Sequence, residues 1–258
     1  MRSILILLAA VITVVDISAQ SPAELAAKRV KLPNGWSLTP VGNSLPVGDL
    51  PLNMAVSSSG KYIAVTNNGQ STQSIQLINT KTEEVLDNVE VPKSWYGIKF
   101  SADERTLYAS GGNDNWILIY AIDAGKLLFK DTLKLGTAWP VKISPSGIDL
   151  DNAKKLLYVV TKENNTLYTV DLRKKQPVDS VRLGGEAFSC LLSPDKLELY
   201  ISLWGGDKIL VYNTVQKKLV DSIPVGDNPN EICLTKNGKS LYVANANDNS
   251  VSVIDIKK

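Results

Sequence analysis

The sequence predicts an all-β protein built from repeated four-stranded antiparallel units, which is the pattern of a β-propeller. Three observations favour this fold class. Apolar marker residues recur in phase five times along the chain, and apolar and polar residues alternate with a period of two between turn residues. Helical periodicity is confined to an alanine-rich stretch near Ala23 to Arg29.

The repeat is defined by three marker positions in each unit. The second marker follows the first by ten residues in every unit, and successive units are 44, 50, 42 and 42 residues apart. We expect the tyrosines at the second marker to be buried at equivalent positions. The markers are Met54, Ile98, Ile148, Cys190 and Ile232, then Ala64, Tyr108, Tyr158, Tyr200 and Tyr242, then Ile75, Ile117, Leu167, Ile209 and Val251.

Each unit reads as four strands in a fixed order. A short apolar strand such as IKFS or CLLS runs into a polar turn such as SADERT or SPDKLE. A second strand such as LYAS or LYIS leads to a loop rich in glycine, asparagine and aspartate. A third, alternating strand such as ILIYAID is followed by a lysine-rich turn and a fourth strand. Four strands per repeat of about 40–45 residues indicate one propeller blade.

Five repeats between about residue 46 and residue 258 leave ring closure open, because the last repeat stops at Lys258 after its third strand. The segment Trp36 to Val41, within an N-terminal segment at 20–45, is a candidate fourth strand that would close a five-bladed ring. The favoured alternative is an incomplete arc of a seven-bladed propeller, which would need about 290 residues at this repeat length.

The N-terminus predicts a signal peptide at residues 1–19. Arg2 precedes an apolar run from Ile4 to Val15, and the small residues Ser18 and Ala19 follow. This run falls short of the 18–20 apolar residues, roughly, that a membrane span requires. We therefore expect no transmembrane segment and an exported protein, periplasmic or extracellular.

Composition excludes several function classes. The chain contains no histidine, which removes histidine-based catalytic triads and histidine metal ligands. A formal net charge of +2 gives no support for nucleic-acid binding. Cys190 and Cys233 occupy adjacent register positions, so we expect two buried free thiols on opposite sheet faces rather than a disulfide. We expect no catalytic residue, no metal site and no cofactor in this chain.

The last blades resemble a known family. LYVANANDNSVSVIDIKK, preceded by VGDNPNEICLTKNGKS, is similar to the YVTN-type β-propeller repeat of the YncE-like family. The stretch LPNGWSLTPVGNSLPVGDLPLNMAVSSSGKYIAVTNNGQSTQSIQLI, with SGGNDN at residues 110–115, resembles the N-terminal propeller of exported bacterial proteins. Longer members of that group carry a C-terminal phosphoesterase domain that this sequence does not contain. The resemblance implies the fold and the compartment, not the activity.

Candidate binding residues lie in the loops that should share one face of the blades. Aromatic rings beside amide side chains can bind a polar small molecule, a glycan or a protein. For the asparagines and aspartate the competing explanation is turn formation, and for the tryptophans it is structural packing. The loop around Trp139 carries eight extra residues, which favours binding there. The candidates are Trp95, Trp139, Trp204, Asn113, Asp114, Asn115, Asn230 and Asn247.

The opposite face carries lysine-rich turns, including Lys174 and Lys175, which we interpret as a solvated surface. Two functions remain open. The first is an exported, non-catalytic binding module, for which the resemblance implies a place as the front part of a longer phosphoesterase. The second is a lactonase-like propeller hydrolase with a carboxylate or calcium site at the channel mouth. The lack of histidine and of a dense carboxylate cluster favours the first.

Overall fold

The computed structural model describes residues 21–39 and 43–256. Residue contacts divide the chain into an N-terminal unit, Met1–Pro46, and a second unit, Val47–Lys258. Helix α1 (Pro22–Ala27) of the N-terminal unit begins at a capping box: the Ser21 hydroxyl accepts from the Glu24 N–H at 3.2 Å, and the Glu24 carboxylate accepts from the Ser21 N–H at 2.7 Å. The predicted signal peptide, residues 1–19, lies outside the described residues.

The N-terminal unit also contains the candidate ring-closing segment. Strand β2 (Ser37–Leu38) pairs antiparallel with β1 (Val30–Lys31) as a two-stranded sheet. Residues 40–42 lie outside the described part of the chain. Ring closure by this segment therefore stays a prediction.

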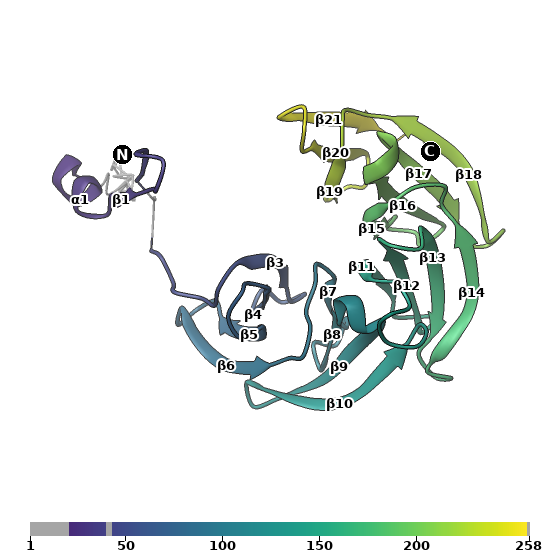
Figure 1. Cartoon of the computed structure of the whole chain (residues 1–258), viewed down its shortest axis with the longest axis horizontal. Coiled ribbons are helices and arrows are strands. Elements are labelled where there is room, and N and C mark those ends of the chain that lie inside the picture. Colours follow the sequence, from purple (N-terminus) through teal and green to yellow (C-terminus); the bar gives the residue numbers. More distant parts are fainter. Residues whose placement is uncertain (1–20, 40–42, 257–258) are drawn as a thin grey trace, which may run out of the picture. The chain divides into compact units, whose positions relative to one another are not determined.

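The described part of the second unit forms five antiparallel sheets, four with four strands and a fifth with three, as the sequence predicts. In Figure 1 these blades follow one another along an arc, with the first strand of each toward the centre and the fourth strand of the four-stranded blades at the rim. The first blade consists of β3 (Pro51–Val56), β4 (Tyr62–Asn67), β5 (Ser74–Asn79) and β6 (Glu84–Glu90), and the second of β7 (Ile98–Phe100), β8 (Thr106–Ser110), β9 (Trp116–Asp123) and β10 (Lys126–Lys134). The third blade consists of β11 (Pro145–Asp151), β12 (Leu156–Thr161), β13 (Thr166–Asp171) and β14 (Gln176–Arg182), and the fourth of β15 (Ala187–Leu192), β16 (Glu198–Leu203), β17 (Lys208–Asn213) and β18 (Lys218–Pro224). The fifth blade consists of β19 (Pro229–Leu234), β20 (Ser240–Asn245) and β21 (Ser250–Asp255).

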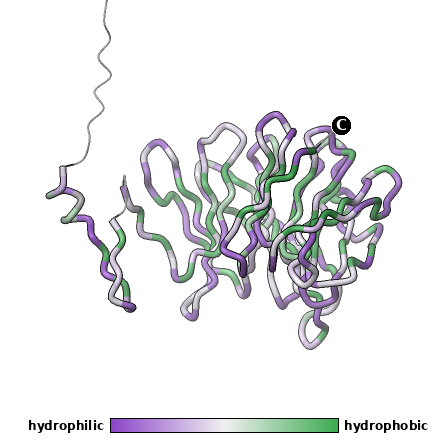
Figure 2. The backbone as a smooth tube through the Cα atoms, turned by 90° about the horizontal axis from the view of Figure 1, so that it is seen from above, coloured by the Kyte–Doolittle hydropathy of each residue, from purple (hydrophilic) through white to green (hydrophobic). Residues whose placement is uncertain are grey.

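The register of the repeats is confirmed in all five blades. The first-strand marker lies opposite the residue after the second-strand marker, as in Ile98 opposite Ala109 and Ile232 opposite Val243. Successive side chains of a strand point to opposite faces of its sheet. The rim strand β14 shows this, because exposed and half-buried positions alternate along its whole length. Figure 2 shows the hydrophobic segments along the strands and hydrophilic segments at the turns.

The hydrophobic core lies between neighbouring blades. Four clusters of buried side chains each combine residues of two successive blades. The repeat tyrosine packs on the next blade: Tyr108, Tyr158 and Tyr200 are 8%, 1% and 2% exposed. Tyr242 is 39% exposed, so the prediction that all four are buried is wrong for this residue. The described chain places no further blade against its side of the fifth sheet.

The cysteines are both free, as predicted. Cys190 lies opposite Ile201, whereas Cys233 lies opposite Tyr242, one register step away. That step points them to opposite faces of their sheets. Cys190 is buried, and burial raises the pKa of its thiol. Cys233 is exposed, which corrects the expectation that both are buried, because its sheet face has no covering blade in the described chain.

The first strands of adjacent blades approach very closely at the centre of the arc. A Cβ atom on Gly97 would lie 2.2 Å from the Ser146 carbonyl oxygen, so a larger residue there would collide with backbone. Hydroxyl groups tie one blade to the next: Ser110 Oγ donates to the Pro145 carbonyl at 2.5 Å, and Ser202 Oγ donates to the Asn230 carbonyl at 2.6 Å. These contacts fix where each first strand begins, and thereby place the loops before it.

Among the described residues, no helix has the length and apolar character needed to cross a bilayer.

Candidate functional site

Two sets of loops lie on one face of the blades because the strands run antiparallel. The turn between the second and third strands and the connection to the next blade leave from the same end of the sheet. Trp95 precedes β7 and Trp139 precedes β11, whereas Trp204 begins the 3-10 turn η2 (Trp204–Gly206) after β16. The three predicted tryptophans therefore share a face, as the repeat pattern implies.

A pocket of about 290 Å³ on this face combines loops from three consecutive blades. We call it the Trp95 pocket. The first two blades contribute the loop after β4, the connection to β7 and the 3-10 turn η1 (Gly112–Asp114), and the third contributes residues before β11 and after β12. Its lining residues are Asn68, Gln73, Lys93, Ser94, Trp95, Gly112, Asn113, Ser144, Lys162 and Glu163.

Trp95 is held from both sides. Its N–H donates to the Ser110 carbonyl at 3.2 Å, which anchors the backbone to β8. The Lys162 ammonium lies 5.5 Å from the centre of the indole ring, within the range of a cation–π contact. The indole Nε1 is buried and has no hydrogen-bond partner among the described residues. Trp116 Nε1 and the Tyr96 hydroxyl are buried without a partner in the same way, so this feature does not distinguish Trp95 from them.

Asn113 and Asn115 have different roles although they are neighbours. Asn113 lines the Trp95 pocket, and its Oδ1 accepts from Ser144 Oγ at 2.9 Å. Asn115 is fully buried, and its amide group binds four backbone groups of the loop before β11. It also adopts a left-handed φ of 61°, which asparagine tolerates. Asn115 thus organises the long loop, in line with the competing explanation of turn formation.

Trp139 lies on that long loop but is not part of the Trp95 pocket. Its side chain is 60% exposed, and Lys142 Nζ lies 5.5 Å from the ring centre. Asp114 faces a separate shallow hollow together with Trp116 and Lys134. The extra residues of the third blade therefore add an exposed indole and line the separate hollow, but they do not line the Trp95 pocket.

Trp204 belongs to an aromatic row that joins two blades. Its ring stacks on Phe188 with centroids 5.6 Å apart, and Phe188 in turn contacts Tyr96 at 4.5 Å. Asn230 accepts from its neighbour's backbone N–H through Oδ1, and Asn247 donates to the Asn228 side chain. These three predicted candidates have structural partners in the loops and do not line the Trp95 pocket.

The structure thus brings Trp95 and Asn113 together and leaves the other candidates apart. Sequence reasoning missed Gln73, Lys93, Ser144 and Lys162 as pocket residues. For Lys162 a signal was present, because it stands in the same loop set as the asparagines that follow β12. Gln73 belongs to a longer loop of the first blade, where the marker spacing already departs from the other repeats by two residues.

A second concavity, the central hollow, measures about 350 Å³ and is lined by the first strands of all five blades. Lys99 and Asp149, on neighbouring first strands, form an ion pair at 2.7 Å, and the Asp149 carboxylate is almost fully buried. Glu231 is exposed overall and lines the hollow, where the surrounding strands partly desolvate its carboxyl group. This desolvation raises the pKa of Glu231 to about 7. Among the described residues, no three acidic, cysteine or histidine side chains gather as a metal site would require.

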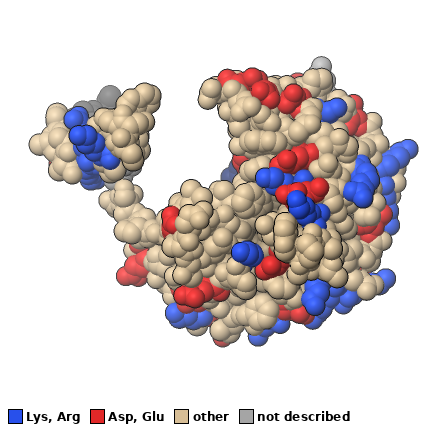
Figure 3. Space-filling view, viewed as in Figure 1, with Lys and Arg blue, Asp and Glu red and all other residues tan. Residues whose placement is uncertain are grey.

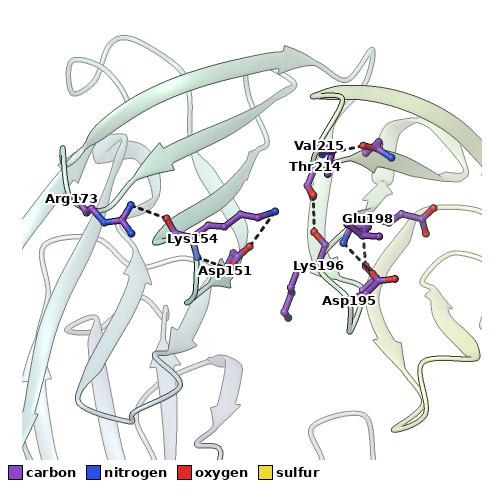
Figure 4. Close-up of polar contacts among 11 residues, drawn as sticks. Asp151, Lys154, Arg173, Asp195, Lys196, Glu198, Thr214 and Val215 are labelled. Carbon is purple, nitrogen blue, oxygen red and sulfur yellow. Dashed lines mark hydrogen bonds and ion pairs between the residues drawn. The ribbon is translucent and has the colours of Figure 1, made fainter.

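The lysine-rich turns lie at the other ends of the strands. Figure 4 shows two of them, with Lys154 paired to Asp151 at 3.7 Å and the Lys196 carbonyl accepting from Thr214 Oγ1 at 2.7 Å. Lys155, Lys175, Lys196 and Lys217 all have a left-handed φ between 55° and 63°. Their backbones therefore form the turns. On the face that Figure 3 presents, basic and acidic side chains are interspersed rather than segregated by sign.

Comparison with known proteins supports the fold and a distant relationship. A family model described as "Lactonase, 7-bladed beta-propeller" matches residues 187–258, which form the fourth and fifth blades. Antigen Lp49 of Leptospira interrogans serogroup Icterohaemorrhagiae serovar copenhageni is 29% identical over 174 residues. The match covers 66% of this chain but 37% of that relative, so the chain spans well under half of its length.

Solved structures share the architecture at low identity. A chain of hydrazine synthase from Kuenenia stuttgartiensis has a TM-score of 0.59 at 17% identity, over 84% of this chain and 87% of that one. A protein of unknown function from Desulfotomaculum acetoxidans has a TM-score of 0.67 at 15% identity, over 80% of this chain and 68% of that one. At such identities the likeness shows the propeller fold alone.

Proposed function

We propose that this chain is an exported, non-catalytic β-propeller module that binds a polar ligand at the Trp95 pocket. The observation that carries the proposal is the pocket itself, in which three consecutive blades bring an indole ring, amide side chains and ammonium groups around about 290 Å³. Pockets that combine an aromatic wall with a few polar groups are typical of ligand sites. A solvated turn region does not require the tryptophan.

Export rests on the N-terminal sequence. Arg2, the apolar run that follows it and the small residues before Gln20 match the three regions of a secretory signal. Expression with and without residues 1–19, followed by fractionation of the cells, tests the proposal. Retention of the full-length chain in the cytoplasm would contradict it.

The binding proposal is tested by two tryptophan variants that share a face but differ in their relation to the pocket. Trp95→Ala removes the pocket wall, whereas Trp139→Ala removes an exposed indole outside the pocket. Thermal melts of both variants and the parent are recorded with monosaccharides, amino acids and dipeptides at millimolar concentration. We expect a ligand-induced shift that Trp95→Ala loses and Trp139→Ala keeps. A shift that persists in Trp95→Ala would place the site elsewhere.

A lactonase-like hydrolase is the second candidate function, favoured by the family model that matches the last two blades. In the central hollow, Glu231 is the group suited to this chemistry, because a carboxylate with a pKa about 7 can take a proton from an attacking water near neutral pH. Hydrolysis of a simple lactone by the parent, lost in Glu231→Gln and kept in Trp95→Ala, would favour this function. The absence of turnover in all three would leave the binding module as the function.

The resemblance to exported propeller–phosphoesterase proteins adds a proposal about context. In that arrangement the propeller precedes a phosphoesterase domain, and the Trp95 pocket would present a ligand beside a separate catalytic unit. The reading frame downstream of this sequence tests the idea directly. A frame that encodes no such domain would remove it without affecting the binding proposal.

A further inference from the structure

We propose that the Trp95 pocket binds a small anionic ligand, of about the size of a monosaccharide, whose carboxylate or phosphate is held by Lys93 and Lys162. This inference rests on the proposed binding function and names the class of ligand. Three observations carry it: the balance of charge around the pocket, the balance of hydrogen-bond donors and acceptors, and the volume.

Among the side chains that line the pocket, ammonium groups outnumber carboxylates. Two ammonium groups, of Lys93 and Lys162, line it against one carboxylate, of Glu163. Lys93 is exposed and forms no ion pair with any described residue. Lys162 pairs with Glu186 at 3.5 Å, but both side chains remain more than a third exposed, so this pair holds the lysine loosely. An anion in the pocket would meet two cations, one of which has no competing partner.

Two of the three amide side chains in the pocket wall also have donors to spare, whereas Asn68 Nδ2 already donates to the Ser94 carbonyl. Gln73 Oε1 accepts from the Ser94 N–H at 2.7 Å, which orients the amide so that its Nε2 hydrogens face away from that contact. Asn113 Oδ1 accepts from Ser144 Oγ at 2.9 Å, which in the same way leaves its Nδ2 hydrogens available. With the ammonium groups, the wall therefore offers more donors than acceptors. A ligand rich in acceptor oxygens satisfies such a wall, as a carboxylate or phosphate with neighbouring hydroxyls does.

The volume limits the size of the ligand. At about 290 Å³ the pocket lies at the lower end of the usual range of ligand pockets, about 300–1,000 Å³. One monosaccharide or a similar small metabolite fits this space, whereas an extended peptide or an oligosaccharide would have to leave it. The indole ring of Trp95 provides the apolar wall on which a compact ring can lie.

The test uses three probes that share a sugar ring and differ in charge: glucuronate, glucose 6-phosphate and neutral glucose. Binding is measured by isothermal titration calorimetry. We expect at least one of the two anions to bind about tenfold more tightly than glucose, the difference that one charge-assisted contact provides. The two anionic arms distinguish a carboxylate from a phosphate ligand. Equal binding of glucose, or no binding of either anion, would overturn the proposal.

Variants of the lining charges give the sign of the effect. Lys93→Gln and Lys162→Gln should each weaken anion binding about tenfold, whereas Glu163→Gln should strengthen it because a repelling carboxylate is removed. Lys142→Gln is the matched control, since Lys142 contacts the exposed Trp139 instead of the pocket. Affinity that is lost in Trp95→Ala but unchanged in both lysine variants would leave the pocket as a binding site and reject an anionic ligand.

Discussion

Lys196 occupies a backbone position at which the first and fifth blades use glycine. In the turn between the first and second strands, Gly60 and Gly238 have φ values of 74° and 68°, and Lys196 has a φ of 63°. A residue with a Cβ atom pays about 1–2 kcal/mol in this left-handed region. We expect Lys196→Gly to raise the free energy of unfolding by up to about 1 kcal/mol, after subtraction of the entropy that glycine adds to the unfolded chain. Urea denaturation measures the change.

The control for this prediction is Gly60→Ala in the first blade. A Cβ atom at Gly60 would meet no heavy atom within 4 Å, so the substitution changes backbone preference alone. We expect it to destabilise the protein by about 1 kcal/mol. If both variants shifted stability in the same direction, backbone strain would not be the cause.

Glu231 makes stability depend on pH. Its pKa is about 7 in the folded protein against an ordinary value of 4.5, so the folded state binds more protons between these values than the unfolded state does. The contribution of Glu231 to stability should therefore fall as pH rises from 4.5 to about 7 and become level above that range. Glu231→Gln, which is neutral throughout, should lack this loss. Urea midpoints of the parent and of Glu231→Gln at pH 5 and pH 8 test the sign. Between pH 5 and pH 8 the midpoint of the parent should fall relative to that of the variant.

At the scale of the blade, the repeat tyrosine stabilises the interface with the next blade. Tyr200 is 2% exposed, and its hydroxyl donates to Glu198 at 2.6 Å, whereas Tyr242 at the equivalent position is 39% exposed. We expect Tyr200→Ala to cost about 3–5 kcal/mol and Tyr242→Ala about 1 kcal/mol in this chain. Equal losses in denaturant melts would show that the tyrosines act within their own sheets rather than between blades.

The repeat tyrosines also show how much of the fold the sequence predicts. Period-two alternation and the three markers were sufficient for the register of every blade, because a strand's own residues determine which face each side chain takes. Burial of Tyr242 and Cys233 depends on a neighbouring sheet instead, and the pattern of one strand carries no information about that neighbour. The repeat pattern therefore predicts the register of the strands, but it does not predict which side chains of the first and last sheets are exposed.

The loops were harder to predict than the strands. The shared face of Trp95, Trp139 and Trp204 follows from antiparallel topology, and the sequence predicts it. Which of these residues meet in a pocket depends on loop paths that side-chain hydrogen bonds determine. Asn115 illustrates this: it reads as a binding candidate in the sequence, but its four hydrogen bonds build the loop that carries Trp139. Asparagine suits both roles, so residue type alone cannot separate them.

Over the whole second unit, stability should be graded along the arc of blades. The third blade shares one hydrophobic cluster with the second and another with the fourth, whereas the fifth shares a cluster with the fourth alone among the described residues. In repeat proteins, neighbour interfaces add to the stability of each unit, so a unit with one interface opens more readily. A difference in stability between blades would then measure the packing between neighbouring blades rather than the hydrogen bonding within each sheet.

Hydrogen exchange tests this gradient with two matched strands. Strands β12 and β20 are the second strands of the third and fifth blades, and each is hydrogen-bonded to a strand on both sides within its sheet. The ladders on either side of the two strands are alike, so a difference in protection comes from the blades packed against them and from the fourth strand, which the third sheet has and the described fifth sheet lacks. We expect amides of β12 to exchange at least about tenfold more slowly than those of β20, by mass spectrometry of the native protein. Equal protection would mean that the unit opens all at once, and that the clusters between blades couple the five sheets into one cooperative body.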